Sequence, residues 1–401
     1  MPKINNAKSA RIPRTVWVLG FVSMLMDVSS EIIHSLLPVF MTVALGASAT
    51  TVGIIEGIAE ATALIVKVFS GVMSDYVGKR KSLTLIGYGM GALSKPLFAL
   101  ASGTGWVLSA RFIDRIGKGM RGAPRDALIA DVTDPAVRGA AFGLRQSLDT
   151  VGAFVGPLLA VGLMLLWADD FRAVFWVAVI PGLLAVALLA LGVREPERKR
   201  SLEKPAFPIS RRALGLLPRT YWWVVGAGAL LTLARFSEAF LVLRAQQGGL
   251  SIALVPLVMV LMNIVYALGA YPFGILADKI RHKTLLMLGI APLIVADLLL
   301  AYDRSLGWIA AGVIFWGVHM AATQGLLAAM VADTAPAELR GTAFGLFNLA
   351  SGMAMLVASV VAGLLWDRFG AATTFQAGAA FAAAALVLLL FRGAADQTAA
   401  H

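Results

Sequence analysis

Two stretches of this chain repeat each other half a chain apart, and this internal duplication constrains the fold more than any other feature. Residues 131–144 read DVTDPAVRGAAFGL, and residues 333–346 read DTAPAELRGTAFGL. A second pair, GVMSDYVGKRK at 71–81 and GILADKIRHK at 274–283, repeats a glycine, an aspartate four positions later and a basic cluster. Two repeats in register predict two homologous halves with a functional site between them.

The composition places both halves in a membrane. Apolar residues make up 59% of the chain, charged residues only 14%, and the mean hydropathy is +0.81. A soluble protein has about 25% charged residues, whereas a helix crosses a bilayer with about 20 apolar residues. The sequence predicts an all-α membrane protein with twelve transmembrane helices, near residues 15–40, 50–73, 83–101, 105–129, 138–166, 171–193, 221–244, 252–276, 284–302, 306–331, 342–365 and 371–391.

These helices divide evenly between the two repeats. We expect two pseudo-symmetric six-helix bundles around a central cavity, with residues 1–193 in the first and 221–401 in the second. Between them, residues 194–220 contain prolines and many charges, which is typical of a linker between bodies that move.

The basic residues predict the orientation in the membrane. One side holds the basic N-terminal segment, clusters at 79–81 and 279–283, the 194–220 segment, Arg138 and Arg340, whereas the opposite connections hold only Arg172, Arg244, Arg304 and Arg368. By the positive-inside rule, both termini are cytoplasmic, and we expect a bacterial-type inner membrane. The net charge of +11 then reflects topology rather than nucleic-acid binding. The N-terminus reads as retained, without a cleavage site.

Three spaced motifs resemble those of the major facilitator superfamily, over nearly the whole chain. Asp75, Gly78, Lys79 and Arg80 match that family's loop motif between the second and third helices. The run from Arg115 to Gly119 is similar to its fourth-helix motif, with Lys118 where glutamine is usual. Gly143, Gly152 and Gly156-Pro157 are similar to the fifth-helix motif of the family's drug/proton antiporter branch, with Ala160 in place of the closing glycine.

The resemblance implies a gate. In the family, the loop motif is a latch that stabilises the outward-open state, which assigns gating to Asp75, Lys79 and Arg80, and to Asp278 at the equivalent place in the second half. A solvated loop is the alternative, and it explains the basic residues but not an aspartate at both positions. Gly152 and Gly156 lie on one helix face beside Pro157, so a neighbouring helix can approach closely and seal one end of the cavity. Ordinary packing is the alternative.

Ionisable residues inside the predicted spans are the candidates for a functional role, because each costs about 3 kcal/mol at mid-bilayer unless it is paired or faces a water-filled cavity. In the first helix Asp27, Glu31 and His34 share one face. Two acids and an imidazole so close will not all stay charged, so we expect a carboxylate here to carry a proton. At about 1.5 Å per residue, Arg115 lies at a similar depth to Asp27. Asp27, Glu31 and Arg115 are therefore predicted to couple transport to protons; simple ion pairs that orient the helix are the alternative.

Other polar side chains predict the lining of a substrate cavity: His34, Glu56, Arg121, Asp149, Arg235, Glu238, Asn263, Trp316 and His319. Packing is an equally good explanation for Trp316. Several charges are spaced for local pairs, namely Glu60 with Lys67, Arg145 with Asp149, and Arg235 with Glu238. Asp297 is expected outside the cavity and receives no role.

Three classes of function remain open. The leading hypothesis is a proton-coupled secondary transporter that exports a small organic solute or drug by antiport. An importer of an anionic metabolite or metal chelate is the alternative, since the fourth helix carries many cations. A receptor or intramembrane enzyme is disfavoured, because the sequence lacks metalloprotease, nucleophile-elbow and phosphate-loop motifs. We expect a monomer with no metal and no cofactor beyond the proton gradient; without cysteine, thiolate sites are excluded.

Overall fold

The structure is a computed structural model, and it describes residues 11–77, 79–195, 211–336 and 339–398. Every regular element in these residues is helical. The first half contains α1 (Arg14–His34), α2 (Leu37–Val39), η1 (Phe40–Ala44), α3 (Ala49–Val77), α4 (Arg80–Ala99), α5 (Thr104–Val132), η2 (Pro135–Val137), α6 (Arg138–Leu166) and α7 (Phe171–Gly192). The second half contains α8 (Arg211–Leu216), α9 (Arg219–Ala234), α10 (Ala239–Gln247), η3 (Ile252–Leu254), α11 (Leu257–Lys279), α12 (His282–Tyr302), α13 (Leu306–Thr323), α14 (Leu326–Thr334), α15 (Arg340–Phe369) and α16 (Ala371–Thr398).

Nine helical segments in the described residues are long and apolar enough to cross a membrane. Helices α3, α4 and α5 are also long, at 29, 20 and 29 residues, but they are not among the nine. In α5 the charge explains the difference, since this helix carries seven ionisable residues between Arg111 and Asp126. Such a helix needs protein partners for its charges rather than lipid.

Three of the predicted helices are interrupted, contrary to the continuous spans expected at 15–40, 221–244 and 306–331. Breaks follow His34, Ala234 and Thr323, where α1, α9 and α13 end. In the break between α9 and α10 (residues 235–238), the Ser359 hydroxyl accepts a hydrogen bond from the Ser237 amide at 3.3 Å. Neighbouring side chains thus satisfy backbone groups that a continuous helix would have paired itself, which is how membrane helices tolerate breaks.

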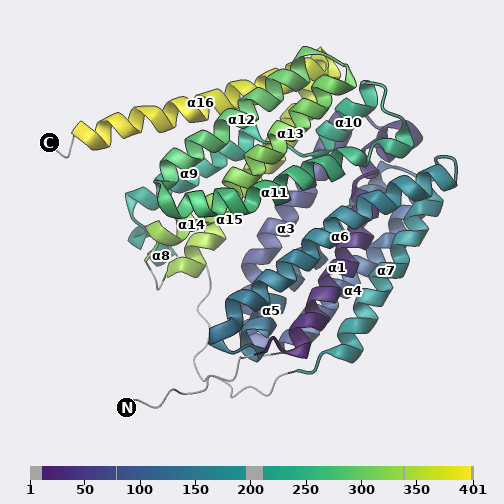
Figure 1. The fold of residues 1–401 in the computed structure, drawn as a ribbon, viewed down its shortest axis with the longest axis horizontal. Helices are drawn as coiled ribbons and strands as arrows, with labels where there is room; N and C mark the ends of the chain where they lie inside the picture. The colour runs from purple at the N-terminus through teal and green to yellow at the C-terminus, as the bar shows by residue number, and fades with distance from the viewer. Residues whose placement is uncertain (1–10, 78, 196–210, 337–338, 399–401) are drawn as a thin grey trace, which may run out of the picture.

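The two halves pack against each other along a seam between α3 and α15 (Figure 1). Glycines line this seam on both helices. A side-chain carbon on Gly57 of α3 would lie 3.0 Å from Leu356 Cα, and one on Gly363 of α15 would lie 2.6 Å from Thr50 Cα. Missing side chains therefore let the two backbones approach closely. We call this contact the α3–α15 seam.

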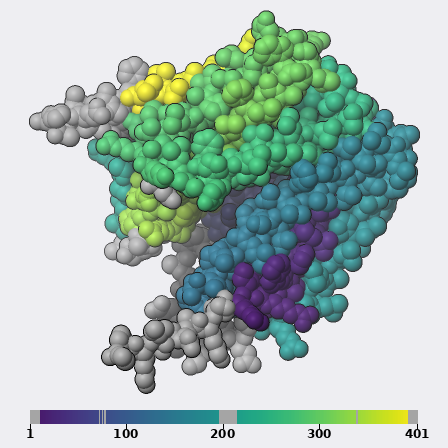
Figure 2. Space-filling view, viewed as in Figure 1, coloured from purple at the N-terminus to yellow at the C-terminus, as the bar shows by residue number. Residues whose placement is uncertain are grey.

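The halves lie close together at one end of the molecule and apart at the other. At the end where α3 begins, here the Ala49 end, α2 contacts α10, and η3 contacts α6. At the opposite end, where α4 begins, here the Arg80 end, Figure 2 shows a hollow between the blue surface of α5 and α6 and the lime-green surface of α14 and α15. The central space between the halves therefore opens toward the Arg80 end.

The duplication is visible in the contacts of each half. In the first half, Arg80 at the start of α4 pairs with Asp131 near the end of α5. In the second half, His282 at the start of α12 lies 3.1 Å from Asp333 near the end of α14. The aspartates are the first residues of the two repeated segments. Both halves therefore tie the same pair of helix ends together.

Candidate functional site

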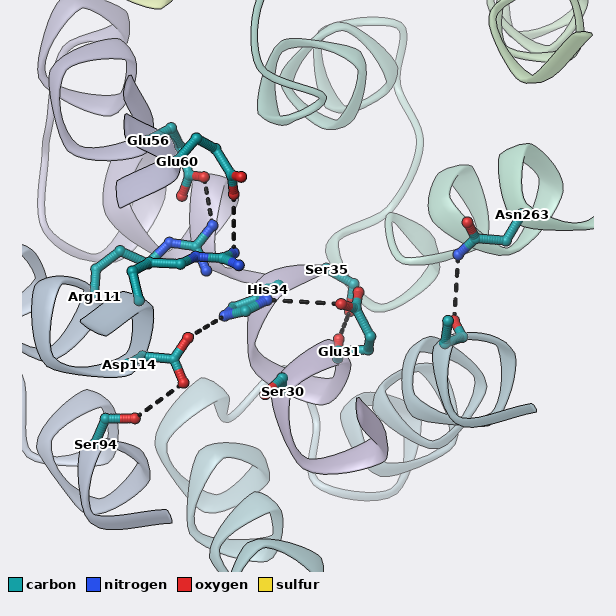
Figure 3. A network of polar contacts seen from close by, with 12 residues as sticks. Ser30, Glu31, His34, Ser35, Glu56, Glu60, Ser94, Arg111, Asp114 and Asn263 are labelled. Carbon is teal, nitrogen blue, oxygen red and sulfur yellow. Dashed lines mark hydrogen bonds and ion pairs between the residues drawn. The ribbon is translucent and has the colours of Figure 1, made fainter. Parts of the chain in front are cut away.

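Two ion pairs join α3 to α5 inside the first half. The Glu56 carboxylate lies 2.5 Å from the Arg111 guanidinium, and that of Glu60 lies 3.2 Å from Arg115 (Figure 3). The two acids are four residues apart on α3, and the two arginines are four residues apart on α5, so each helix presents both of its residues on one face. The two ion pairs therefore stack one helical turn apart. Arg115 thus pairs with a neighbouring carboxylate. The expected pair of Glu60 with Lys67 is wrong, because Glu60 turns toward α5.

A buried cluster joins α4, α5 and α1. Lys95 is completely buried, and its ammonium donates hydrogen bonds to Asp114 at 2.8 Å and to the Ser30 hydroxyl at 3.0 Å. Ser94 also donates to Asp114, at 3.3 Å (Figure 3). A charge removed from water needs a close counter-charge and hydrogen bonds, and Lys95 has both. The sequence reasoning missed Lys95, although a lysine inside the predicted span 83–101 was a visible signal.

His34 connects this cluster to the acidic face of α1. Its Nε2 lies 3.5 Å from Asp114, and its Nδ1 lies 3.7 Å from Glu31 (Figure 3). Among the described residues, Glu31 has no other side-chain ion pair within 4.0 Å, and Asp27 has none. The predicted face of Asp27, Glu31 and His34 therefore exists, and its Asp27 carboxylate is unpaired among the described residues.

The glycines of α6 pack directly behind these carboxylates. A side-chain carbon on Gly152 would lie 2.9 Å from Asp27 Cβ, and one on Gly156 would lie 2.7 Å from Glu31 Cβ. Helix α6 continues through the adjacent Pro157. The close approach expected of these glycines is thus made to α1 within the same half, at the two acids themselves.

A second polar layer lies toward the Arg80 end. Arg145 lies 2.5 Å from Asp149, as its spacing predicted, and 3.9 Å from Asp126. Arg125 contacts Asp126 at 3.1 Å and donates to Ser23 at 2.9 Å. Positive and negative groups therefore alternate through this layer, which keeps its net charge small.

Arg121 is held by an aromatic ring. Its guanidinium lies 4.8 Å from the centre of the Tyr88 ring, a cation–π contact. The Tyr88 hydroxyl in turn lies 2.8 Å from that of Ser23. Lys118, one turn before Arg121, is exposed and has no ion pair within 4.0 Å to any side chain that the structure describes.

The predicted cavity residues of the second half fall into two groups. Arg235 and Glu238 lie in the break between α9 and α10, where both are half-buried and form no ion pair with each other. Glu238 is close enough to Glu31, Glu60 and Lys118 of the first half to interact with their charges. The side-chain amide of Asn263 donates to Ala153 O at 3.3 Å, from α11 to α6 (Figure 3). Glu238 and Asn263 therefore face the first half.

Trp316 and His319 lie elsewhere. Trp316 is fully buried, with its ring 5.7 Å from that of Phe236. His319 is also fully buried, and its Nδ1 lies 2.7 Å from Gly289 O on α12. Both side chains therefore pack inside the second half, away from the network of Figure 3.

The predicted gating residues are placed only in part. Lys79 is exposed before α4, and Arg80 is buried, where it pairs with Asp131 and donates to Ala127 O at 2.9 Å. The side chains of Asp75 and Asp278 lie outside the described residues, as do Gly78 and most of the 194–220 segment.

One contact between the halves was missed by sequence reasoning. At the Ala49 end, the Asp367 carboxylate of α15 accepts hydrogen bonds from the backbone amides of Ala49, at 3.0 Å, and Thr50, at 2.8 Å. Amides at a helix N-terminus favour a carboxylate. The second half therefore caps α3 of the first half.

No group of three or more histidine, cysteine or acidic side chains that could hold a metal ion occurs in the described residues. The first half contains a set of charged side chains among its helices, some buried and some partly exposed, beside the hollow between the halves. Most of these charges are neutralised in pairs, and the carboxylate of Asp27 is not. Such an arrangement suits the binding and release of protons or of a small charged solute.

Comparison with known proteins identifies the family. The sequence profile of the Major Facilitator Superfamily matches residues 19–248 and 238–400. The uncharacterized MFS-type transporter MJ1317 of Methanocaldococcus jannaschii is 32% identical over 395 residues, which cover 96% of this chain and 97% of that protein. The multidrug resistance protein MdtL of Shewanella oneidensis is 24% identical over 247 residues, or 61% of each chain.

A solved structure has the same fold. A mutant of the nucleoside transporter NupG superposes with a TM-score of 0.80 at 14% identity, covering 94% of this chain and 99% of that one. The profile match, the relative at 32% identity and the shared fold agree with the duplicated halves and the apolar helices. This chain therefore belongs to the Major Facilitator Superfamily and is a multi-pass membrane transporter.

Proposed function

We propose that this protein is a proton-coupled secondary transporter that exports a small organic solute or drug by antiport. In this proposal twelve helices form two bundles, residues 1–193 and 221–401, which rock about the α3–α15 seam and open a central site to each side in turn. The protein works as a monomer in the inner membrane and draws its energy from the proton gradient alone.

The observation that carries the proposal is the acidic face of α1. Asp27 and Glu31 lie on a helix inside the first half, pressed against Gly152 and Gly156 of α6. Glu31 lies near His34, and in the described residues half-buried Asp27 has no ion pair within 4.0 Å. A carboxylate that is partly removed from water and lacks a counter-charge is stabilised when it carries a proton. Release of that proton would change the charge of the site, and with it the preference for one conformation.

The basic residues indicate which side of the membrane the hollow faces. The connections at the Arg80 end carry the clusters 79–81 and 279–283, so the positive-inside rule places this end in the cytoplasm. Both termini then face the cytoplasm, and the conformation described here is inward-open. The Ala49 end, sealed by Asp367, faces outward.

An importer of an anionic metabolite or metal chelate is the second candidate. The exposed ammonium of Lys118 favours it, since this cation forms no ion pair within 4.0 Å in the part of the chain that the structure describes. The other cations of α5 favour it less. Arg111 and Arg115 are held by Glu56 and Glu60, and they would bind a substrate anion only by giving up those partners. The weak similarity to the multidrug resistance protein MdtL supports export.

The test measures flux direction and proton dependence together. A ligand found by thermal-shift screening of the purified protein would be loaded on one side of proteoliposomes, and a pH gradient imposed in each direction. Antiport predicts that the solute moves against the proton flow, whereas proton-driven import predicts movement with it. Asp27→Asn and Glu31→Gln should each abolish the effect of the gradient while ligand exchange continues. A wild-type response to the gradient in both variants would refute coupling through α1.

A further inference from the structure

Asp297 in the middle of α12 is the most isolated ionisable group in the described part of the second half. It has 0% exposure, and neither carboxylate oxygen has a hydrogen-bond partner in the described residues. The proton-coupling face on α1 belongs to the other half of the chain. An aspartate buried this completely needs an explanation beyond packing, because leucine or asparagine would fill the same space without a titratable group.

Two neighbours cover Asp297. On α16, Gly378 lies so close that a side-chain carbon placed on it would be 2.6 Å from Asp297 Oδ2 and 3.0 Å from Phe236 Cε1. Phe236 belongs to the break between α9 and α10, and its ring also packs against Trp316 and Phe375 at 5.7 and 5.5 Å. Asp297 thus lies close to the break between α9 and α10.

The elements around Phe236 and Asp297 carry few ionisable groups. Arg235 and Glu238 flank Phe236 in the break, and Arg235 also acts electrostatically on the buried His319 of α13, which packs against α12. The described side chains of α16, residues 371–390, include no ionisable group. Arg235, next to Phe236 in the sequence, is therefore the cation that a rearranged break could bring to Asp297.

There is room for the covering ring to move. Helices α9, α15 and α16 line a crevice of about 130 Å³, and both Phe236 and Gly378 are among its lining residues. The remaining lining is almost entirely apolar, which suits an aromatic ring. Displacement of Phe236 into this crevice would uncover the carboxyl group of Asp297 toward the break.

We propose that Asp297 is a second proton-binding site, protonated while Phe236 covers it and deprotonated when the break rearranges. An ionised carboxylate without a partner in the protein interior is too unfavourable to persist, so the covered state holds the neutral acid. On rearrangement, the O–H bond breaks, the proton passes to water in the central hollow, and the carboxylate pairs with the Arg235 guanidinium. The role of this step in transport rests on the proposed function, but the protonation itself does not.

Infrared spectroscopy of the purified protein in lipid nanodiscs tests the proposal without a substrate. At neutral pH, the wild-type protein should show the C=O stretching band of a protonated carboxylic acid that is lost in Asp297→Asn. The band should remain in Asp303→Asn, since Asp303 is exposed at the end of the same helix and serves as the matched control. Carbon-13 labelling of aspartate should shift the band in the unsubstituted protein, which removes any dependence on the folding of a variant.

The partner is tested by titration. In Arg235→Gln the band should persist to a higher pH than in the wild type, because the deprotonated acid has lost its cation. No band assignable to Asp297 would overturn the protonation, and an unchanged titration in Arg235→Gln would overturn the exchange with Arg235. A failure of antiport in the flux assay would leave both results standing, so the two proposals can fail separately.

Discussion

The two halves of this chain arise from one repeated pattern, yet they use charge in opposite ways. In the first half, five helices contribute several groups of paired charges, from Glu56 with Arg111 to Arg145 with Asp149. In the second half, the corresponding interior is mainly apolar and aromatic, and the buried Asp297 has no hydrogen-bond partner among the described residues. Both halves keep the same tie between helix ends, Arg80 with Asp131 and His282 with Asp333. One repeated pattern can therefore hold paired charges in one copy and an apolar, aromatic interior in the other.

The largest expected effect tests whether charge stabilises only the first half. Glu56→Gln leaves the buried Arg111 without its counter-charge and should lower the free energy of unfolding by about 3–5 kcal/mol. Asp297→Asn removes a carboxyl group that has no partner, so its unfolding should be nearly unchanged. Denaturation of the two variants in the same detergent measures the difference. Equal losses of stability would remove the contrast between the halves.

The next effect concerns geometry within the network. Arg115→Lys keeps the positive charge beside Glu60 but loses the planar fork of donors. A hydrogen bond between charged groups contributes about 1.5–3 kcal/mol, so the transport rate should fall roughly tenfold or more. Rates in proteoliposomes provide the measurement, with protein amounts matched. Near-normal transport would mean that a point charge is sufficient at this position.

A smaller effect tests whether the close approach of α6 to α1 matters. Gly156→Ala would place a methyl group 2.7 Å from Glu31 Cβ, and the resulting overpacking should cost about 1–3 kcal/mol of stability and reduce proton-dependent flux. Gly162→Ala in the same helix is the matched control, because no atom lies within 4 Å of the added methyl group. Similar behaviour of the two variants would assign Gly156 to ordinary packing.

The smallest effect concerns the contact between the halves at the Ala49 end. Asp367→Asn weakens the cap on α3 by about 1 kcal/mol, which should shift the balance away from the inward-open state by roughly fivefold. Spin labels on the Ala49 ends of the two halves would report a longer distance. Asp170→Asn is the control, since Asp170 caps α7 within its own half. An equal distance change in both variants would show that the cap does not couple the halves.

A further prediction compares the loop motif of the first half with its counterpart in the second half. Asp75 stands in a full match to the family motif, whereas Asp278 lacks the glycine and the paired basic residues that follow it. Asp75→Asn should therefore impair turnover more than Asp278→Asn does. Distances between labels at positions 79 and 281 would report the accompanying shift toward the inward-open state. Full activity and unchanged distances for Asp75→Asn would favour a solvated loop.

Patterns local to one helix were the part of this molecule that the sequence could predict. The shared face of Asp27, Glu31 and His34 and the pair of Arg145 with Asp149 follow from helical spacing alone, and both are present. The repeated segments predicted two related halves because duplication is a property of the sequence itself. The family followed from spaced motifs and is confirmed by the comparisons.

Contacts between helices were harder to predict. Nothing in the spacing of Glu60 distinguishes Lys67 on its own helix from Arg115 on another, and the structure selects Arg115. The breaks after Ala234 and Thr323 were missed because no proline lies at either one, and a neighbouring hydroxyl, that of Ser359, helps to compensate the first. The contact of Asp367 with the start of α3 could not be predicted, since Asp367 meets Ala49 and Thr50 only after both halves have assembled.

The α3–α15 seam also has a consequence for how the protein is made. Most of the chain lies between these two helices, so the ribosome releases α3 into the bilayer long before α15 exists. Until then the glycines of α3 face lipid, which they can do without penalty because they expose no polar side chain. Early domains fold during synthesis, so the first half can complete its ion pairs while the seam stays empty. Docking of α15 is then a late event of biogenesis, and the amides of Ala49 and Thr50 receive their cap only when α15 arrives.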